Sequence, residues 1–113
     1  MLAPQTVVDA AAIPIPLAPV PAAQVREGAP TTGWVELVAG GAEAAAIGVW
    51  EHTPGVSTDV EADEVFIVLS GRGTLAHPGG LLDLGPGTMG RLSAGTETVW
   101  TITETLRKVY VGG

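Results

Sequence analysis

The chain has 113 residues, no cysteine, and twelve acidic against five basic residues, for a formal net charge of -7. This length gives one domain with a modest core, and the acidic balance excludes nucleic acid and anionic membrane surfaces as expected partners. The absence of cysteine excludes disulfide and thiol chemistry, and together with the lack of a signal peptide or a membrane-spanning run it predicts a cytoplasmic protein.

Residues 1–23 are rich in proline and alanine and predict an extended N-terminal arm. Pro14, Pro16, Pro19 and Pro21 exclude a helix or an interior strand there. The apolar side chains between these prolines are expected to pack along a barrel wall or a neighbouring subunit: Ile13, Ile15, Leu17 and Val20. A flexible leader is the alternative. The folded barrel is expected over residues 24–113.

From Gly33 onward apolar residues recur with a period of two, which indicates strands. Strands are expected at residues 34–38, 44–52, 56–60, 65–69, 74–76, 81–84, 89–92, 97–103 and 106–111. The almost wholly apolar stretch 65–69 predicts a strand buried on both faces. Gly71 and Gly73 predict a tight turn, and Pro78-Gly79-Gly80 predicts a hairpin tip. Many short strands without an amphipathic helix predict an all-β sandwich or closed barrel.

The spacing of several motifs points to a known family. Glu64 is followed after six residues by Gly71, and Gly87 leads after five residues to Ser93-Ala94-Gly95. Further matching stretches are WEHTPG at 50–55, DEVFIVLSG at 63–71, SAGTETVW at 93–100 and RKVY at 107–110. On these residues, roughly 24–111 of the chain resembles the cupin superfamily, and within it the cupin_3 group of small bacterial cupins, formerly DUF861.

This resemblance implies a small single-domain cupin fold, a jelly-roll β-barrel of the RmlC-like type, and a homodimer. The group includes proteins that resemble ureidoglycine aminohydrolase and an ethanolamine-utilisation protein. Neither activity is transferred to this chain, because the family's metal-binding positions differ here.

The cupin motifs place three histidines and one glutamate around a metal. The positions that correspond to the histidines are Thr58 and Val60, or Ser57 and Asp59, and then Thr98. Only the glutamate, Glu64, is retained, whereas a catalytic metal normally has about three protein ligands. No cofactor and no metal ligand are therefore expected. The alternative is a divalent metal recruited by His52 or Asp59.

Strand alternation predicts which side chains face the barrel interior. If Glu64 points inward, Phe66 and Val68 do so too. If Thr98 points inward, so do Trp100 and Ile102. The expected pocket is apolar and aromatic with few polar groups, as in many ligand sites, and its candidate residues are His52, Phe66, Arg91, Thr98, Trp100 and Trp50. Glu64 is the candidate catalytic residue, as general acid or base. The alternative is a structural role, paired with Arg91 or with hydroxyl groups.

The remaining polar and aromatic residues are expected to be less informative. Trp50 and Trp100 stack on a ligand or belong to the core, Trp34 lies in the wall or an interface, and His52 lies at a strand end or reaches the barrel mouth. His77 is expected in an exposed turn, and Asp59, Glu61 and Asp63 in a solvated loop. Arg107 and Lys108 are expected at an exposed edge or in a salt bridge across a dimer.

Three functions follow from this sequence. The first is a metal-free module that binds a small uncharged or cationic molecule in the barrel. The second is an enzyme that acts on a small metabolite through Glu64, with or without a metal. The third is a structural or interaction protein whose barrel is filled. A pocket large enough for a ligand favours the first two over the third.

Overall fold

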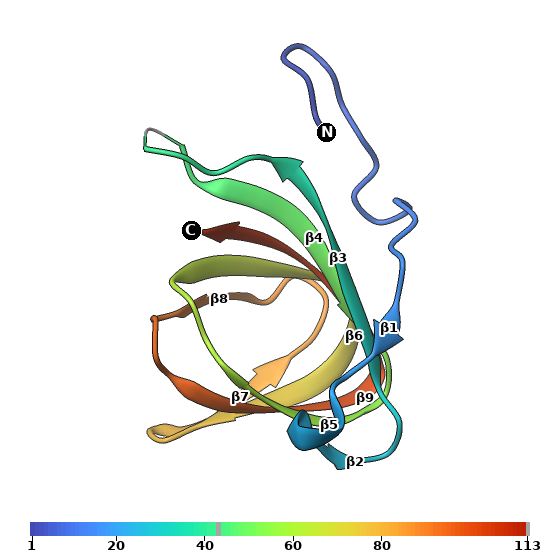
Figure 1. Ribbon diagram of the computed structural model, residues 1–113, viewed down its shortest axis with the longest axis vertical. Helices are drawn as coiled ribbons and strands as arrows, with labels where there is room; N and C mark the ends of the chain where they lie inside the picture. Colours follow the sequence, from blue (N-terminus) through green and yellow to red (C-terminus); the bar gives the residue numbers. More distant parts are fainter. Residues whose placement is uncertain (43, 113) are drawn as a thin grey trace.

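The computed structural model describes residues 1–42 and 44–112, which form a small all-β cupin half-barrel (Figure 1). Gly113, the last residue of the expected barrel, lies outside the described residues. The strands are β1 (Ala18–Pro19), β2 (Val25–Glu27), β3 (Thr31–Val38), β4 (Ala46–His52), β5 (Gly55–Val60), β6 (Glu64–His77), β7 (Gly80–Leu84), β8 (Met89–Leu92) and β9 (Glu97–Gly112). One short 3-10 helix, η1, covers Ala22–Gln24.

The long strand β9 lies at the centre of the sheet and pairs with three other strands, all antiparallel. Its first half pairs with β5 and its second half with β4, on the same side, while β6 runs along the other side. Strand β3 extends the β4 edge, and β7 and β8 both pair with β6. This arrangement curls the sheet around one interior, as Figure 1 shows.

The interior is filled from alternate positions of these strands, as the period of two predicts. On β9 the side chains buried inside the barrel are Thr98, Trp100, Ile102, Leu106 and Lys108, all of one parity, whereas Arg107 is buried on the outer face. The core cluster consists of Phe66, Val68, Leu75, Leu84, Leu92, Trp100, Ile102 and Leu106. The expected inward positions of Phe66, Val68 and Ile102 are therefore confirmed.

Strand β6 differs from the prediction at its two glycines. Gly71 and Gly73 do not form a turn but lie inside β6, where the pairing with β9 shifts register. Gly71 has φ +92, and a Cβ there would lie 2.2 Å from the Thr105 carbonyl oxygen. The glycines thus permit a close approach of β6 and β9 where their register shifts. Strand β6 continues through this irregularity without a turn.

The prediction that residues 65–69 are buried on both faces is wrong. Phe66 and Val68 are buried, but Ile67 is 39% exposed on the outer face. No second layer of the described chain covers this part of β6, so only one face is enclosed. The two strands expected at 97–103 and 106–111 are also one continuous strand, β9, and the short strands β1 and β2 were not predicted.

The N-terminal arm runs along the outer side of β3, with its first residues projecting beyond the barrel (Figure 1). Ala18 and Pro19 pair with Thr32 and Thr31 at the edge of the sheet. The Arg107 guanidinium donates from Nη1 to the carbonyl oxygens of Ala10 and Ile13, at 3.1 and 2.7 Å. In the structure Val20 is buried and Leu17 is 39% exposed. The extended arm, with a flexible leader as its alternative, stays a prediction.

Within residues 1–42 and 44–112, no helix is long and apolar enough to cross a membrane.

Candidate ligand pocket

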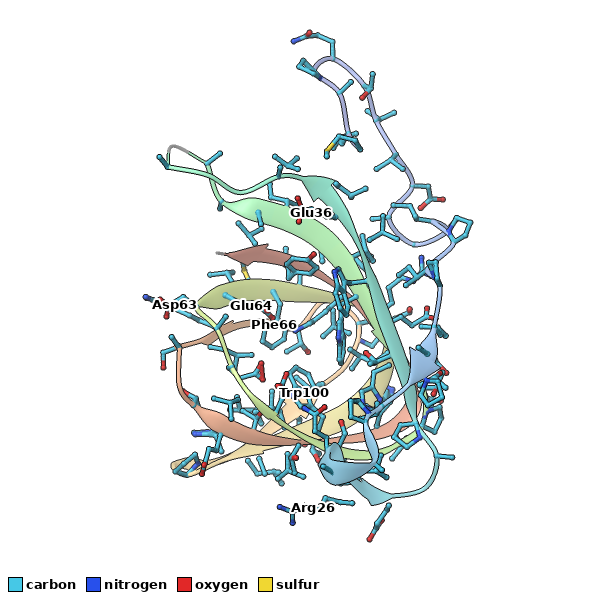
Figure 2. All side chains as sticks on the ribbon, viewed as in Figure 1. Arg26, Glu36, Asp63, Glu64, Phe66 and Trp100 are labelled. Atoms are coloured by element: carbon cyan, nitrogen blue, oxygen red, sulfur yellow. The ribbon has the colours of Figure 1, made fainter. Side chains whose placement is uncertain are left out.

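A pocket of about 350 Å³ opens into the barrel beside Glu64. Its lining residues are Trp34, Trp50, Asp59, Val60, Glu61, Ala62, Glu64, Trp100, Lys108 and Tyr110. Figure 2 shows Glu64, Phe66 and Trp100 inside the barrel, whereas Asp63 and Arg26 point away from it. We call this site the barrel pocket.

The centre of the barrel pocket is the ammonium group of Lys108. Its Nζ lies 4.7 Å from the ring centroid of Trp50, 4.7 Å from that of Trp100 and 4.9 Å from that of Phe66. Strand pairing explains this cage, because Lys108 on β9 lies opposite Trp50 on β4 and Val68 on β6. Such contacts stabilise a cation by about 2 kcal/mol or more where water is excluded.

Glu64 pairs with Lys108, whose Nζ donates to Glu64 Oε2. The expected alternative, a pair with Arg91, is wrong. The register places Arg91 opposite Val65 and Glu64 opposite Leu92, so Arg91 points to the outer face while Glu64 points inward. Arg91 is exposed and is not among the residues that line the barrel pocket.

Lys108 and Arg107 were both predicted at an exposed edge or in a dimer contact, and both are buried within this chain. They occupy opposite faces of β9. Lys108 enters the barrel, and Arg107 donates from Nε to Glu51 Oε1 at 3.0 Å on the outer face, beneath the arm. Alternation along one continuous strand from Trp100 predicts that Lys108 also points inward. This conclusion was not drawn from the sequence because two separate strands, 97–103 and 106–111, were expected there.

Glu61 is a second pocket carboxyl that the sequence reasoning assigned to a solvated loop. It is only 9% exposed, and its Oε2 accepts hydrogen bonds from the Thr98 hydroxyl (2.9 Å) and the Trp100 indole N–H (3.2 Å). Desolvation by burial raises the pKa of Glu61, as does the nearby charge of Asp59, while the Thr98 hydrogen bond opposes this shift. The loop between β5 and β6 thus returns one carboxyl to the interior.

Glu61→Gln is expected to change how stability depends on pH. Because the folded-state pKa of Glu61 lies above the ordinary value of 4.5, the folded chain retains a proton that the unfolded chain releases. This stabilisation is complete below pH 4.5 and is lost as pH rises through the folded-state pKa. Glutamine keeps an acceptor for Thr98 and Trp100 but has no such loss. Stability relative to the parent should therefore increase from pH 4.5 to neutrality in urea unfolding, and a pH-independent difference would contradict the shift.

His52 is the last residue of β4, a strand end as expected, but it is neither exposed nor part of the pocket lining. It is 1% exposed, its Nδ1–H donates to the Thr53 carbonyl at 2.6 Å, and the Ser57 hydroxyl donates to Nε2 at 2.8 Å. Desolvation lowers the pKa of His52 below 6.5, so the neutral ring is favoured. The prediction that His52 is a pocket residue is wrong, because both ring nitrogens are used inside the wall.

The other predicted residues are distributed between the pocket and its surroundings. Trp100 and Trp50 line the pocket, with ring centroids 5.2 Å apart, whereas Phe66 contacts the Lys108 ammonium but is not among the lining residues. Thr98 reaches the pocket through its bond to Glu61. Trp34 is 64% exposed at the rim. His77 is half-buried beside the hairpin tip, where its Nδ1 accepts from the Gly79 N–H.

A larger hollow of about 510 Å³ lies between η1, β5 and the start of β9. It is lined by Gln24, Arg26, Thr58, Asp59, Val60, Ala76, His77, Pro78, Glu97, Thr98 and Val99. Most of its charged groups are exposed, and no aromatic ring of Trp, Tyr or Phe lines it. The barrel pocket is the stronger candidate because three of its charged side chains, Glu61, Glu64 and Lys108, are largely enclosed and converge there.

Comparison with known proteins places the chain in a family. The sequence profile of the EutQ-like cupin domain, Cupin_3, matches residues 39–110. This chain belongs to the EutQ-like cupin family. No curated protein matches the sequence significantly.

The fold is shared with solved members of this group. The ethanolamine utilization protein Q (EutQ) of Salmonella typhimurium LT2 has a TM-score of 0.62 and 21% identity, over 71% of this chain and 67% of that one. EutQ of Clostridium difficile has a TM-score of 0.64 and 15% identity, over 73% of this chain and 67% of that one. A DUF861 protein of unknown function from Pseudomonas syringae pv. tomato DC3000 has a TM-score of 0.76 and 23% identity, over 88% of this chain and 44% of its own length. These likenesses show the fold.

The residues at the metal position of cupins do not fit a metal in this member of the family. Among residues 1–42 and 44–112, no group of three or more His, Cys, Asp or Glu side chains converges to hold an ion. No buried side-chain nitrogen or oxygen in that part of the chain lacks a hydrogen-bond partner. The retained glutamate, Glu64, binds an ammonium instead.

Proposed function

We propose that this cupin binds a small uncharged or cationic molecule in the barrel pocket. One observation carries the proposal. The chain has five aromatic side chains and one lysine, and all six gather at this site. Trp34, Trp50, Trp100, Tyr110 and Lys108 line the pocket, and Phe66 contacts the ammonium. Aromatic walls with a few convergent polar groups are common in small-molecule sites.

The charge of the pocket defines the class of ligand. Its lining includes three carboxyl groups, Asp59, Glu61 and Glu64, and one ammonium. The whole chain is also acidic, at -7. An anionic ligand would meet repulsion both at the pocket and on approach. An uncharged or cationic molecule avoids this cost and can use the indole faces of Trp34, Trp50 and Trp100.

The pocket also bears on the alternatives of a filled barrel and an enzyme. A space of about 350 Å³ lies within the range of small-molecule sites, which supports ligand binding over a filled barrel. Glu64 remains a candidate acid or base for an enzymatic reaction, because it faces this space and contacts a lysine. The binding proposal requires only the pocket.

Tryptophan fluorescence is a direct test, because all three tryptophans line the pocket. We expect a screen of small metabolites to yield compounds that change this emission and raise the unfolding temperature. Trp34→Ala should weaken binding of such a compound about tenfold, because it removes an exposed rim contact, and Glu64→Gln should weaken it too.

Leu81→Ala is the matched control, since Leu81 is equally exposed, at 64%, but lies on β7 away from the pocket. It should leave affinity unchanged. Equal affinity in the parent, Trp34→Ala and Glu64→Gln for every compound that binds would reject the barrel pocket as the site.

We also propose that binding needs no metal. The support is the pairing of Glu64 with Lys108 and the full use of both His52 nitrogens. Elemental analysis after incubation with Mn, Fe, Ni and Zn should find far less than one metal ion per chain. Near-stoichiometric retention would contradict this proposal, and Glu64 would be the first ligand to substitute.

A homodimer and a cytoplasmic location complete the proposal. The dimer is supported by the apolar side chains on the outer face of β6, β8 and β9, where Ile67, Met89 and Val111 are 39%, 66% and 39% exposed. Size-exclusion chromatography with light scattering should give twice the chain mass of 11.4 kDa, and a single-chain mass would refute the dimer. The cytoplasmic location rests on the acidic, cysteine-free sequence.

A further inference from the structure

The only lysine of this chain lies in the barrel pocket. The other four basic residues are arginines, and Arg26, Arg72 and Arg91 are exposed. Lysine and arginine differ chemically, because an amine can lose a proton and attack an electrophile, whereas a guanidinium stays protonated. An arginine would supply the same charge to Glu64 with more hydrogen bonds. The use of lysine here therefore points to the chemistry of the amine.

We propose that Lys108 forms an imine with a small aldehyde or ketone bound in the barrel pocket. The inference rests on the proposed function, since it uses the same pocket, and it names the chemical class of the ligand. Covalent attachment through a lysine is an established use of this side chain in proteins that bind carbonyl compounds.

The reaction balances without any further reactant. Glu64 accepts a proton from the Lys108 ammonium, and the free Nζ lone pair attacks the carbonyl carbon to form a C–N bond. The carbonyl oxygen takes up a proton and becomes the hydroxyl of a carbinolamine. In the same stage the attacking nitrogen loses one proton, which balances the proton gained by the oxygen and leaves a neutral carbinolamine with a nitrogen lone pair. The hydroxyl then leaves as water after gaining a second proton, while that lone pair forms the C=N bond. Overall, one ammonium and one carbonyl compound give one iminium ion and one water.

The surroundings of Nζ suit each stage of this reaction. Glu64 Oε2 contacts Nζ directly, so the first proton acceptor is in place. The iminium ion keeps the positive charge of the ammonium, so the rings of Trp50, Phe66 and Trp100, at 4.7 to 4.9 Å from Nζ, can stabilise both. The reaction therefore conserves the charge that this cage stabilises.

Glu61 supplies a second carboxyl on the same indole that covers Lys108. Its Oε2 lies 3.2 Å from Trp100 Nε1, and it lines the pocket with Lys108 and Glu64. Burial favours the protonated form of Glu61 more than that of an exposed glutamate. It can therefore donate a proton to the departing hydroxyl. Two carboxyl groups thus divide the work, with Glu64 accepting and Glu61 donating.

Reductive trapping tests this inference on the intact protein. The parent is incubated with sodium cyanoborohydride together with one carbonyl compound at a time. The uncharged compounds are glyceraldehyde, acetone and benzaldehyde, and pyruvate is the anionic comparison. Reduction converts an imine into a stable secondary amine, which intact mass and peptide mapping locate. We expect an adduct on Lys108 with at least one uncharged carbonyl compound, and less with pyruvate because of the pocket carboxyl groups.

The variant Arg91→Lys provides an internal reference, because it adds an exposed lysine on β8 outside the barrel pocket. In this one protein the adduct at Lys108 should form at least about tenfold faster than at position 91, owing to binding beside the amine. Its rate should saturate with carbonyl concentration, while that at position 91 rises linearly. Lys108→Arg should abolish the adduct at position 108. Equal or slower labelling of Lys108 than of position 91 would overturn the inference, and mapping the Arg91→Lys protein gives this answer whether or not Lys108→Arg folds.

The failure of this inference can be distinguished from the failure of the proposed function. A carbonyl compound or other metabolite that changes the tryptophan emission but leaves no adduct on Lys108 rejects the imine and keeps the binding pocket. Loss of both signals rejects both. An adduct confined to the N-terminal amine and position 91 rejects the imine as well.

Discussion

Glu64→Leu should destabilise the protein by about 3 kcal/mol. The substitution removes the carboxylate that pairs directly with the buried Lys108 ammonium, and an unpaired buried charge typically costs about 3–5 kcal/mol. The lower end applies because the Glu64 side chain is 18% exposed, against 5% for Lys108. Since small domains have about 5–15 kcal/mol of stability in total, urea unfolding should show a large shift of the midpoint.

The double variant Glu64→Leu/Lys108→Met distinguishes lost pairing from lost packing. Removing both charges replaces the ion pair by apolar groups, which is often close to neutral for stability. We therefore expect the double variant to recover most of the stability lost in Glu64→Leu. A double variant that is less stable than the single one would show that the charge pair does not account for the effect.

Arg107→Ala should cost about 2–4 kcal/mol and release the N-terminal arm. Arg107 is 8% exposed, and it joins Glu51 to the carbonyl oxygens of Ala10 and Ile13. Hydrogen bonds to charged groups contribute about 1.5–3 kcal/mol each, and the Glu51 carboxylate, 17% exposed, would lose its cation. Urea unfolding should report the loss, and thermolysin should cut the apolar segment before β1 faster than in the parent.

Arg72→Ala is the matched control. Arg72 also pairs with a glutamate, Glu104, at 3.8 Å, but both side chains are about two-thirds exposed, at 67% and 66%. Exposed pairs contribute little, so a change within about 0.5 kcal/mol is expected, with no effect on the arm. Equal effects of Arg107→Ala and Arg72→Ala would mean that the arm is held by its apolar contacts alone.

The ion pair and the arm tether lie back to back on adjacent residues of β9. Alternation places Lys108 in the pocket and Arg107 on the outer face, so one short segment supports both the site and the wall around it. Side chains on strand β4 alternate in the same way, with Trp50 opposite Lys108 and Glu51 opposite Arg107. The barrel pocket is therefore supported from outside by the arm, through the same pair of strands.

The sequence predicted the strands and the direction of most interior side chains. Phe66, Thr98, Trp100 and Ile102 were all expected inside and are buried. These predictions succeed because side-chain direction in a strand alternates locally and needs no knowledge of neighbours. The family spacing around Glu64 and Gly71 likewise predicted the cupin fold, which the match over residues 39–110 confirms.

The partners of the charged residues could not be predicted in the same way. Glu64 and Lys108 are 44 positions apart, and only the register between β6 and β9 brings them together while turning Arg91 outward. The inward return of Glu61 depends on the path of a loop that has no period.

What the sequence by itself determined is thus the fold, the inward parity of the strands and the residues other than histidine at the positions of the cupin motif histidines, because each depends on local pattern or residue identity. What only the tertiary structure decided is which charges meet inside the barrel, because strand register sets those contacts across long separations.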